Sequence, residues 1–181
     1  MPNIKPLDPA QATGDTAKAL DSVKAKLGAI PNLIATIAQA PAALQFYLKA
    51  NEGVAAGRFT AKQRELIAIG VADANACAYC LSAHTAIGGM VGLQPTDLEA
   101  ARDGHAANPR DAALITLARR IVLARGHLDA ADLTRARNDG LSDADILETI
   151  ALVALNVFTN YVNHIAGTEI DFPPVALRKA A

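Results

Sequence analysis

The sequence predicts an all-helical fold, on the evidence of its composition and of the spacing of its helix-terminating residues. Of the 181 residues, 51% are hydrophobic but only 4% are aromatic, and alanine recurs throughout. Alanine favours close-packed helices, whereas strands are enriched in β-branched and aromatic side chains. Glycine and proline fall mostly at the boundaries of apolar stretches. We therefore expect a single helical domain over residues 1–181, long enough to bury a substantial core.

Capping and breaking residues divide the chain into the expected helices. Ser, Thr, Asp and Asn favour the helix N-cap, proline the first turn, and glycine the position after the last turn. In chain order, the expected helices and their signals are 15–27 (Asp15, Gly28), 32–39 (Pro31), 41–55 (Pro41, Gly57), 61–74 (Thr60), 76–91 (Asn75, Gly92), 96–103 (Pro95, Gly104), 112–125 (Asp111, Gly126), 130–137 (Gly140) and 145–164 (Ser142). Residues 1–14 are expected to be irregular. Residues 168–181 are expected to form an extended tail, because Pro173 and Pro174 disfavour a helix.

Both cysteines of the chain lie in one stretch, Cys77-Ala78-Tyr79-Cys80-Leu81-Ser82-Ala83-His84. If this stretch is helical, Cys77, Cys80 and His84 fall at i, i+3 and i+7, on one stripe. The thiolate is the reactive form of cysteine, and a helix N-terminus or a neighbouring base makes it easier to form. The second thiol is within disulfide reach and can resolve an oxidised partner. The stretch therefore predicts a redox site.

Glu65 lies on the expected helix that precedes the cysteines, after a capping box formed by Thr60 and Gln63. Its stripe is otherwise small and apolar. The carboxylate either reaches solvent at the edge of the stripe or is partly buried, with a raised pKa suited to proton transfer. The sequence leaves both alternatives open.

Other polar and aromatic side chains give weaker signals. Asn156, Asn160 and His164 follow one another at i, i+4 and i+8 on the last helix. They form either an interhelical hydrogen-bond ladder, which we favour because buried amides usually serve packing, or part of a pocket. Phe46 and Tyr47 are expected to be core or interface residues, with a pocket position as the alternative.

The charge pattern excludes some partners. The formal net charge is −1, with 17 basic and 18 acidic residues spread along the chain. Nucleic acids and anionic membranes require a concentrated basic face, so neither is expected as a partner. The start of the chain has no signal-peptide pattern, and no run of about 18 uncharged apolar residues suggests a span. We expect a cytoplasmic protein, where a C-x-x-C pair is more often catalytic or metal-binding than structural. The mean hydropathy of +0.19 predicts a homo-oligomer.

Glu65, the pair Cys77 and Cys80, and His84 together resemble the active-site motif of the alkylhydroperoxidase D (AhpD-like) family, within the carboxymuconolactone decarboxylase superfamily. The resemblance includes the spacing from the acid to the first cysteine, the pair itself, and the histidine four residues after the second cysteine. Residues 156–173 also resemble the peroxidase-related branch. The resemblance covers about residues 20–175.

This resemblance implies an AhpD-like compact helical domain with a two-helix C-x-x-C hairpin, assembled into trimers or hexamers, that reduces organic hydroperoxides or hydrogen peroxide. In the family's scheme Cys80 attacks the peroxide and becomes a sulfenic acid, and Cys77 condenses with it to a disulfide. Glu65 and His84 relay the proton. The electron donor is a dithiol such as a lipoylated protein, and no metal, haem or flavin is needed. Some members have a second histidine where this chain has Tyr79, a candidate pocket residue.

Other functions stay open at this stage. A C-x-x-C pair also serves thiol-disulfide exchange, with peroxide reduction incidental. Alternatively, the two cysteines, His84 and Glu65 are four potential zinc ligands, although three ligands on one helix stripe diverge along its length. The superfamily's lactone decarboxylases generally do not use the cysteine pair. The small, apolar composition around the motif favours an organic hydroperoxide as substrate over a charged one.

Overall fold

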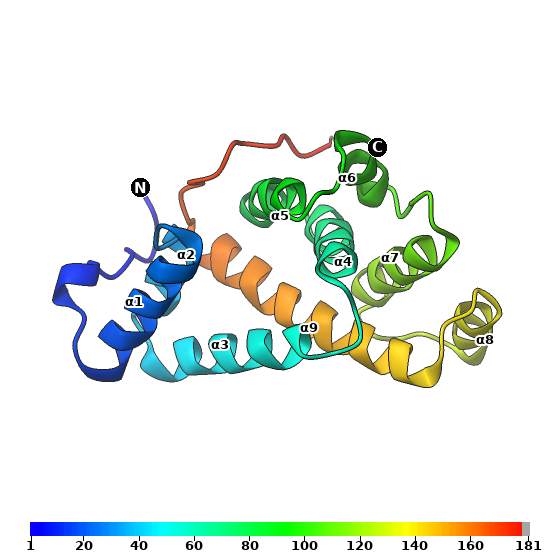
Figure 1. Ribbon diagram of the computed structural model, residues 1–181, viewed down its shortest axis with the longest axis horizontal. Coiled ribbons are helices and arrows are strands. Elements are labelled where there is room, and N and C mark those ends of the chain that lie inside the picture. The colour runs from blue at the N-terminus through cyan, green and yellow to red at the C-terminus, as the bar shows by residue number, and fades with distance from the viewer. Residues whose placement is uncertain (179–181) are drawn as a thin grey trace.

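The computed structural model describes residues 1–178, and within that range it contains nine α-helices, one short 3-10 helix and no strand (Figure 1). The helices are η1 (Pro9–Gln11), α1 (Gly14–Leu27), α2 (Asn32–Ile37), α3 (Pro41–Ala55), α4 (Ala61–Ala74), α5 (Ala78–Met90), α6 (Pro95–Arg102), α7 (Pro109–Leu123), α8 (Ala130–Asn138) and α9 (Asp143–Ala166). The predicted all-helical fold is confirmed. Residues 179–181 of the expected tail lie outside the described residues.

Helix α4 is the central element, and it packs against α5, α6, α7 and α9. Its seven residues from Leu66 to Ala72 are all buried. Gly70 permits the close approach of α7, because a Cβ atom at this position would lie 2.7 Å from Ile115 Cγ2. Helix α5 lies beside α4 and also contacts α9, so the two helices form the hairpin expected around the cysteines.

The start of α5 differs from the prediction. Asn75 ends α4 instead of capping α5, and Ala76 adopts a left-handed conformation with φ of +52°. The backbone N–H groups of Asn75 and Cys77 donate to the last carbonyls of α4, those of Val71 and Ala72. Satisfying these carbonyls keeps the chain in a tight turn, as helix C-termini require. Cys77 is consequently the extended N-cap residue of α5 and does not lie in its first turn.

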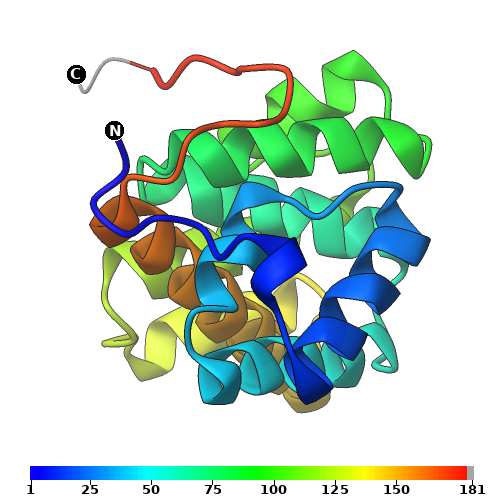
Figure 2. The ribbon, with the colours of Figure 1, turned by 90° about the vertical axis from the view of Figure 1, so that its left-hand side faces the viewer.

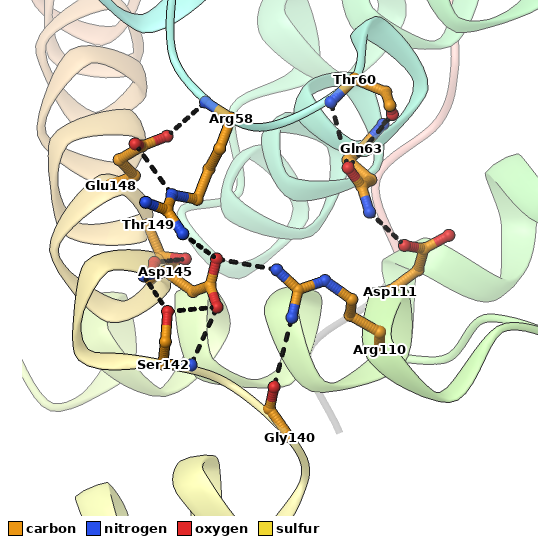
Figure 3. Close-up of polar contacts among 10 residues, drawn as sticks. All are labelled: Arg58, Thr60, Gln63, Arg110, Asp111, Gly140, Ser142, Asp145, Glu148 and Thr149. Atoms are coloured by element: carbon orange, nitrogen blue, oxygen red, sulfur yellow. Dashed lines mark hydrogen bonds and ion pairs between the residues drawn. The ribbon is translucent and has the colours of Figure 1, made fainter.

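Helix α9 is anchored at its N-terminus by the buried carboxylate of Asp145 (Figure 3). Ser142 caps α9 as predicted and forms a capping box with Asp145, which also accepts from Arg110 at 2.7 Å and lies 3.5 Å from Arg58. Burial alone raises the pKa of Asp145, but the hydrogen bonds from Ser142 and Arg110 outweigh it and lower that pKa to about 2. Glu148, one turn on, accepts from the Arg58 backbone N–H. These contacts fix α9 against the loop before α4.

The C-terminal tail leaves α9 at Gly167 and runs without helix or strand past α5 toward α6 (Figures 1 and 2). The Val175 N–H donates to Ser82 Oγ on α5 at 2.9 Å, and Arg102 on α6 donates to the Ala176 carbonyl at 3.1 Å. Asp171 accepts from the Asn32 N–H at the start of α2. The tail therefore closes one side of the domain next to the cysteine helix.

Among the described residues, α9 alone is long and apolar enough, by length and composition, to cross a membrane. Half of its most apolar window is buried inside the domain. A core helix passes the same test, so the observation is weak evidence for a span.

Candidate active site

A cavity of about 240 Å³ lies between α2, α3, α4, α5, α9 and the tail. Apolar side chains form most of its wall, among them Leu33, Ile34, Val54, Ile87, Leu155 and Phe172. Three of the predicted catalytic residues, Cys80, His84 and Glu65, also line it. The cavity thus combines an apolar space with a few convergent polar groups, the usual form of a small-molecule site.

Glu65 and His84 form a pair across the α4–α5 hairpin. His84 Nδ1 lies 2.8 Å from Glu65 Oε2, and the two side chains are 22% and 16% exposed. The Glu65 side chain is therefore mostly buried and does not reach freely into solvent at the edge of its stripe. Burial lowers the pKa of His84, but the charge and the hydrogen bond of Glu65, together with the charge of Cys80, raise it overall. The imidazole is thus held toward its protonated form.

Cys80 lies at the third position of α5, near the positive end of the helix dipole. It is 2% exposed, yet it lines the cavity. Its sulfur accepts a hydrogen bond from Asn163 Nδ2 at 3.2 Å and lies 3.7 Å from Thr159 Oγ1. Hydrogen bonding from the Cys77 thiol and the charge of His84 outweigh burial and lower the pKa of Cys80 to about 6. Cys80 is therefore the cysteine suited to be a thiolate.

Cys77 occupies a different environment behind Cys80. It is buried and is absent from the cavity wall, and its sulfur lies 3.9 Å from the Asn160 carbonyl oxygen. Its hydrogen bond to Cys80 and its burial raise the pKa of Cys77. Because Cys77 precedes the helix, the two cysteines and His84 do not form the single continuous stripe predicted from their spacing. Only Cys80 and His84 face the cavity.

The predicted aromatic residues divide between the cavity and the surface. Tyr79 lines the cavity, its hydroxyl accepts from the Leu33 N–H at 3.1 Å, and its ring meets that of Phe172 at 5.8 Å. Tyr47 also lines the cavity, so the pocket alternative holds for it, and burial with the nearby charge of Cys80 raises the pKa of its phenol to about 12. Phe46 is exposed and packs edge-on against Phe158.

The asparagine line on α9 is only partly a ladder. Asn160 makes the expected interhelical bond, accepting from Asn75 Nδ2 at 2.8 Å, whereas Asn156 lines the cavity and His164 is exposed. The sequence interpretation missed Thr159 and Asn163, the α9 side chains closest to Cys80. Their spacing from Asn156 and Asn160 would have revealed a shared helix face, because residues three and four apart are neighbours.

The zinc alternative lacks a suitable ligand geometry. Within residues 1–178, no three side chains of His, Cys, Asp or Glu come close enough together to hold a metal ion. His105 and His127, which follow helix ends, are exposed and lie outside the cavity wall.

The fold and the site define a class of protein: a helical domain with a buried cysteine pair, one of whose thiols meets an apolar cavity beside a Glu–His pair. Residues 41–114, which include both cysteines, Glu65 and His84, match the family model described as "Carboxymuconolactone decarboxylase family". The match covers this segment of the chain alone, and the fold of the whole domain is that of AhpD-like proteins.

Similar solved structures cover nearly the whole chain. The AhpD-core, peroxidase-related protein from Ralstonia eutropha JMP134 has a TM-score of 0.84 and 23% identity, over 94% of this chain and 92% of that one. A peroxidase-related protein from Silicibacter sp. TM1040 has a TM-score of 0.79 and 24% identity, over 96% and 93%. The debrominase Bmp8, solved with 2,3,4-tribromopyrrole, has a TM-score of 0.79 and 20% identity, over 93% and 91%. No curated protein sequence matches the chain. At these identities, the likeness shows the fold alone.

Proposed function

We propose that the chain is a thiol-dependent peroxidase that reduces an organic hydroperoxide through Cys80 and Cys77. The observation that carries the proposal is the meeting of three features at one place. A cysteine with a pKa lowered to about 6 lines an apolar cavity, and the Glu65–His84 pair lines the same cavity. Thiolate attack on a peroxide needs a nucleophile, a proton donor for the leaving oxygen, and room for the substrate.

In the first step the Cys80 thiolate attacks the terminal peroxide oxygen. A sulfur–oxygen bond forms, the oxygen–oxygen bond breaks, and the leaving alkoxide takes a proton to become an alcohol. His84, held toward its protonated form by Glu65, is the proposed proton donor. Cys80 is oxidised to a sulfenic acid and the peroxide is reduced.

In the second step Cys77 resolves the sulfenic acid. Its sulfur attacks Cys80, a disulfide forms, and the sulfenic oxygen leaves as water after taking the Cys77 proton. The burial of both cysteines supports resolution by Cys77, because it limits the access of a second peroxide that would oxidise the sulfenic acid further. An external dithiol, such as a lipoylated protein, then reduces the disulfide by exchange.

The cavity wall supports an organic substrate. Leu33, Ile34, Ile87 and Leu155 offer apolar contacts that hydrogen peroxide cannot use. Burial of apolar substrate surface is worth about 25 cal/mol per Å². We therefore expect a higher kcat/KM for cumene hydroperoxide than for hydrogen peroxide.

The test is a thiol count on reduced protein before and after one equivalent of cumene hydroperoxide. The wild type should lose both thiols quickly. The Cys77→Ser variant should accumulate a sulfenic acid that dimedone traps, and the Cys80→Ser variant should be inert. Survival of both wild-type thiols would refute the peroxidase proposal.

Two other activities use the same thiols. A thiol-disulfide oxidoreductase would consume a disulfide substrate faster than a peroxide. A reductive debrominase is the second, because Bmp8 shares the fold and this chain has an apolar cavity next to Cys80. Release of bromide from 2,3,4-tribromopyrrole by the reduced protein would favour the latter.

The biological setting also belongs to the proposal. We propose a cytoplasmic homo-oligomer, trimer or hexamer, that acts without nucleic acid or membrane and without a metal or organic cofactor. The outward face of α9 supports self-association, since Leu147, Ile150, Tyr161 and Ile165 are each more than 40% exposed.

A further inference from the structure

The two sulfurs face opposite kinds of hydrogen-bonding group on α9. Cys80 Sγ accepts an N–H from the Asn163 side chain at 3.2 Å. Cys77, by contrast, has the main-chain carbonyl oxygen of Asn160, an acceptor, 3.9 Å from its sulfur. A donor stabilises a thiolate, whereas a carbonyl acceptor stabilises the protonated thiol. Helix α9 therefore gives the Cys80 sulfur a direct amide donor and gives the Cys77 thiol a carbonyl acceptor. Asn163 also lowers the pKa of Cys77, but the contact of Cys77 with Cys80 and its burial outweigh that effect.

The side-chain amide of Asn160, also on α9, is oriented by a hydrogen bond to a residue other than the cysteines. Asn160 Oδ1 accepts from Asn75 Nδ2 at 2.8 Å, which fixes the plane of the Asn160 amide. Asn160 Nδ2 is buried and has no hydrogen-bond partner among the described residues. Buried donors are normally paired, so an unpaired one beside a cysteine pair points to a charge that forms there. The Asn160 side chain also lowers the pKa of Cys80.

Thr159 completes the surroundings of Cys80. In the structure the Thr159 hydroxyl donates to the Asn156 carbonyl at 2.9 Å, and Cys80 Sγ lies 3.7 Å from its oxygen. Rotation of the hydroxyl hydrogen alone would aim it at an ionised sulfur. Cys80 thus has donors on α9 that become more favourable once its proton is lost.

We propose that Asn163, assisted by Asn160, selects Cys80 over Cys77 as the thiolate of the pair, as a positioning residue that acts through the sulfur. For peroxide chemistry this inference rests on the proposed function. The ionisation of Cys80 is independent of the proposed function, because the thiolate forms before any substrate reacts. The other titratable groups around Cys80 are Cys77, Tyr79 and His84 on α5, Glu65 on α4 and Tyr47 on α3.

The test is a pH titration of the ultraviolet thiolate absorbance in the Cys77→Ser background, where Cys80 is the only thiol. Asn163→Leu keeps the approximate size of the side chain and removes the donor. The pKa of Cys80 should rise by about one pH unit, a tenfold smaller thiolate fraction below that pKa. Thr149→Val is the matched control, since Thr149 is buried on α9 and bonds only to its own helix at the Asp145 carbonyl. A pKa that moves no further in Asn163→Leu than in the control overturns the inference.

A second measurement avoids substitution at position 163. In the ¹⁵N-labelled Cys77→Ser protein, the side-chain amide signal of Asn163 should titrate with the same midpoint as the thiolate absorbance. An amide signal that stays constant through that midpoint overturns the inference even if Asn163→Leu does not fold.

Peroxide turnover is measured separately, so that the two proposals can fail independently. A raised pKa in Asn163→Leu without peroxide turnover by the wild type refutes the proposed function and supports this inference. Normal wild-type turnover with an unchanged pKa refutes this inference and leaves the proposed function intact.

Discussion

His84 Nδ1 lies 2.8 Å from Glu65 Oε2, so a carboxylate on α4 and an imidazole on α5 meet at the wall of the cavity that Cys80 also lines. Each partner is on a different helix of the hairpin, and their pairing depends on how closely those helices pack. The Glu65–His84 contact links the fold to the chemistry, because it determines the direction of the His84 imidazole and how readily the imidazole keeps its proton.

Glu65→Gln should slow the oxidation of Cys80. Without the carboxylate, the pKa of His84 falls because burial is less strongly opposed, so a smaller share of the imidazole is protonated at neutral pH. The Cys80 thiolate then loses a neighbouring positive charge. We expect the rate of oxidation by cumene hydroperoxide at pH 7 to fall about 100-fold, measured by stopped-flow kinetics, with the midpoint of the pH profile moved upward. Glu52→Gln, on the exposed face of α3, should change neither. Equal rates in the two variants would contradict the role of Glu65.

The two cysteines should differ in their alkylation by iodoacetamide. Because the pKa of Cys80 is lowered to about 6 and that of Cys77 is raised, labelling of Cys80 should increase as the pH passes through about 6, while Cys77 stays unlabelled. Peptide mass spectrometry of the reduced protein at a series of pH values measures both. Faster labelling of Cys77 would reverse the assignment of the nucleophile.

Ile87→Phe should change the preference for substrate. The larger ring occupies part of the cavity one turn beyond His84. We expect kcat/KM for cumene hydroperoxide to fall about tenfold, while that for hydrogen peroxide changes little, since the smaller molecule needs less room. Leu123→Phe, exposed on α7 and away from the cavity, is the control. A parallel loss with both peroxides would mean that the cavity does not select the substrate.

Asp145→Asn should destabilise the fold at neutral pH. The native carboxylate accepts charged and neutral hydrogen bonds, so its loss should lower the free energy of unfolding by about 2 kcal/mol at pH 7. Because the folded pKa of Asp145 is depressed to about 2, its contribution is full above the ordinary carboxyl pKa and is lost as the pH falls toward 2.

Urea unfolding at pH 7 and at pH 3 measures the effect of Asp145. The difference between wild type and Asp145→Asn should be smaller at pH 3. Asp143→Asn, at an exposed acid in the same helical turn, should cost much less at either pH. A pH-independent difference would mean that the carboxylate charge is not what stabilises the start of α9.

Two helical glycines should respond to alanine with opposite signs. Gly70→Ala drives a methyl group against Ile115 and should lower the free energy of unfolding by about 1 to 3 kcal/mol. Gly53→Ala, on an open face of α3, should raise it by about 0.5 to 1 kcal/mol, because alanine is the better helix former. Urea denaturation of both variants checks the pair. Equal effects would contradict the close approach of α4 and α7.

Much of the fold could be predicted from the sequence because its helix ends carry strong local signals. The capping residues Thr60 and Ser142 lie where predicted, and each satisfies backbone groups within a few residues. The start of α5 was misplaced because Asn75 suits either end of a helix, and the left-handed Ala76 has no signature in residue type. Local patterns cannot decide whether Asn75 ends α4 or caps α5, because the outcome depends on how the last carbonyl groups of α4 are satisfied.

The candidate site was predictable only as far as its parts share a local pattern. Cys80, His84 and Glu65 line one cavity, as the resemblance of their motif implied, but their catalytic roles stay predictions. Asn163 and Thr159 reach Cys80 from more than 70 positions away in the chain. Such contacts depend on how α9 packs against α5, which no local pattern specifies. The same packing separates Cys77 from the cavity.

The measurement that tests the central claim most directly is the intact mass of the Cys77→Ser protein after one equivalent of cumene hydroperoxide. The account predicts a rapid gain of one oxygen atom, located on Cys80 by peptide analysis after dimedone trapping, and no gain in a Cys77→Ser, Cys80→Ser double variant. An unchanged mass, in protein whose Cys80 is shown to be reduced and folded, would contradict the claim that Cys80 attacks peroxides.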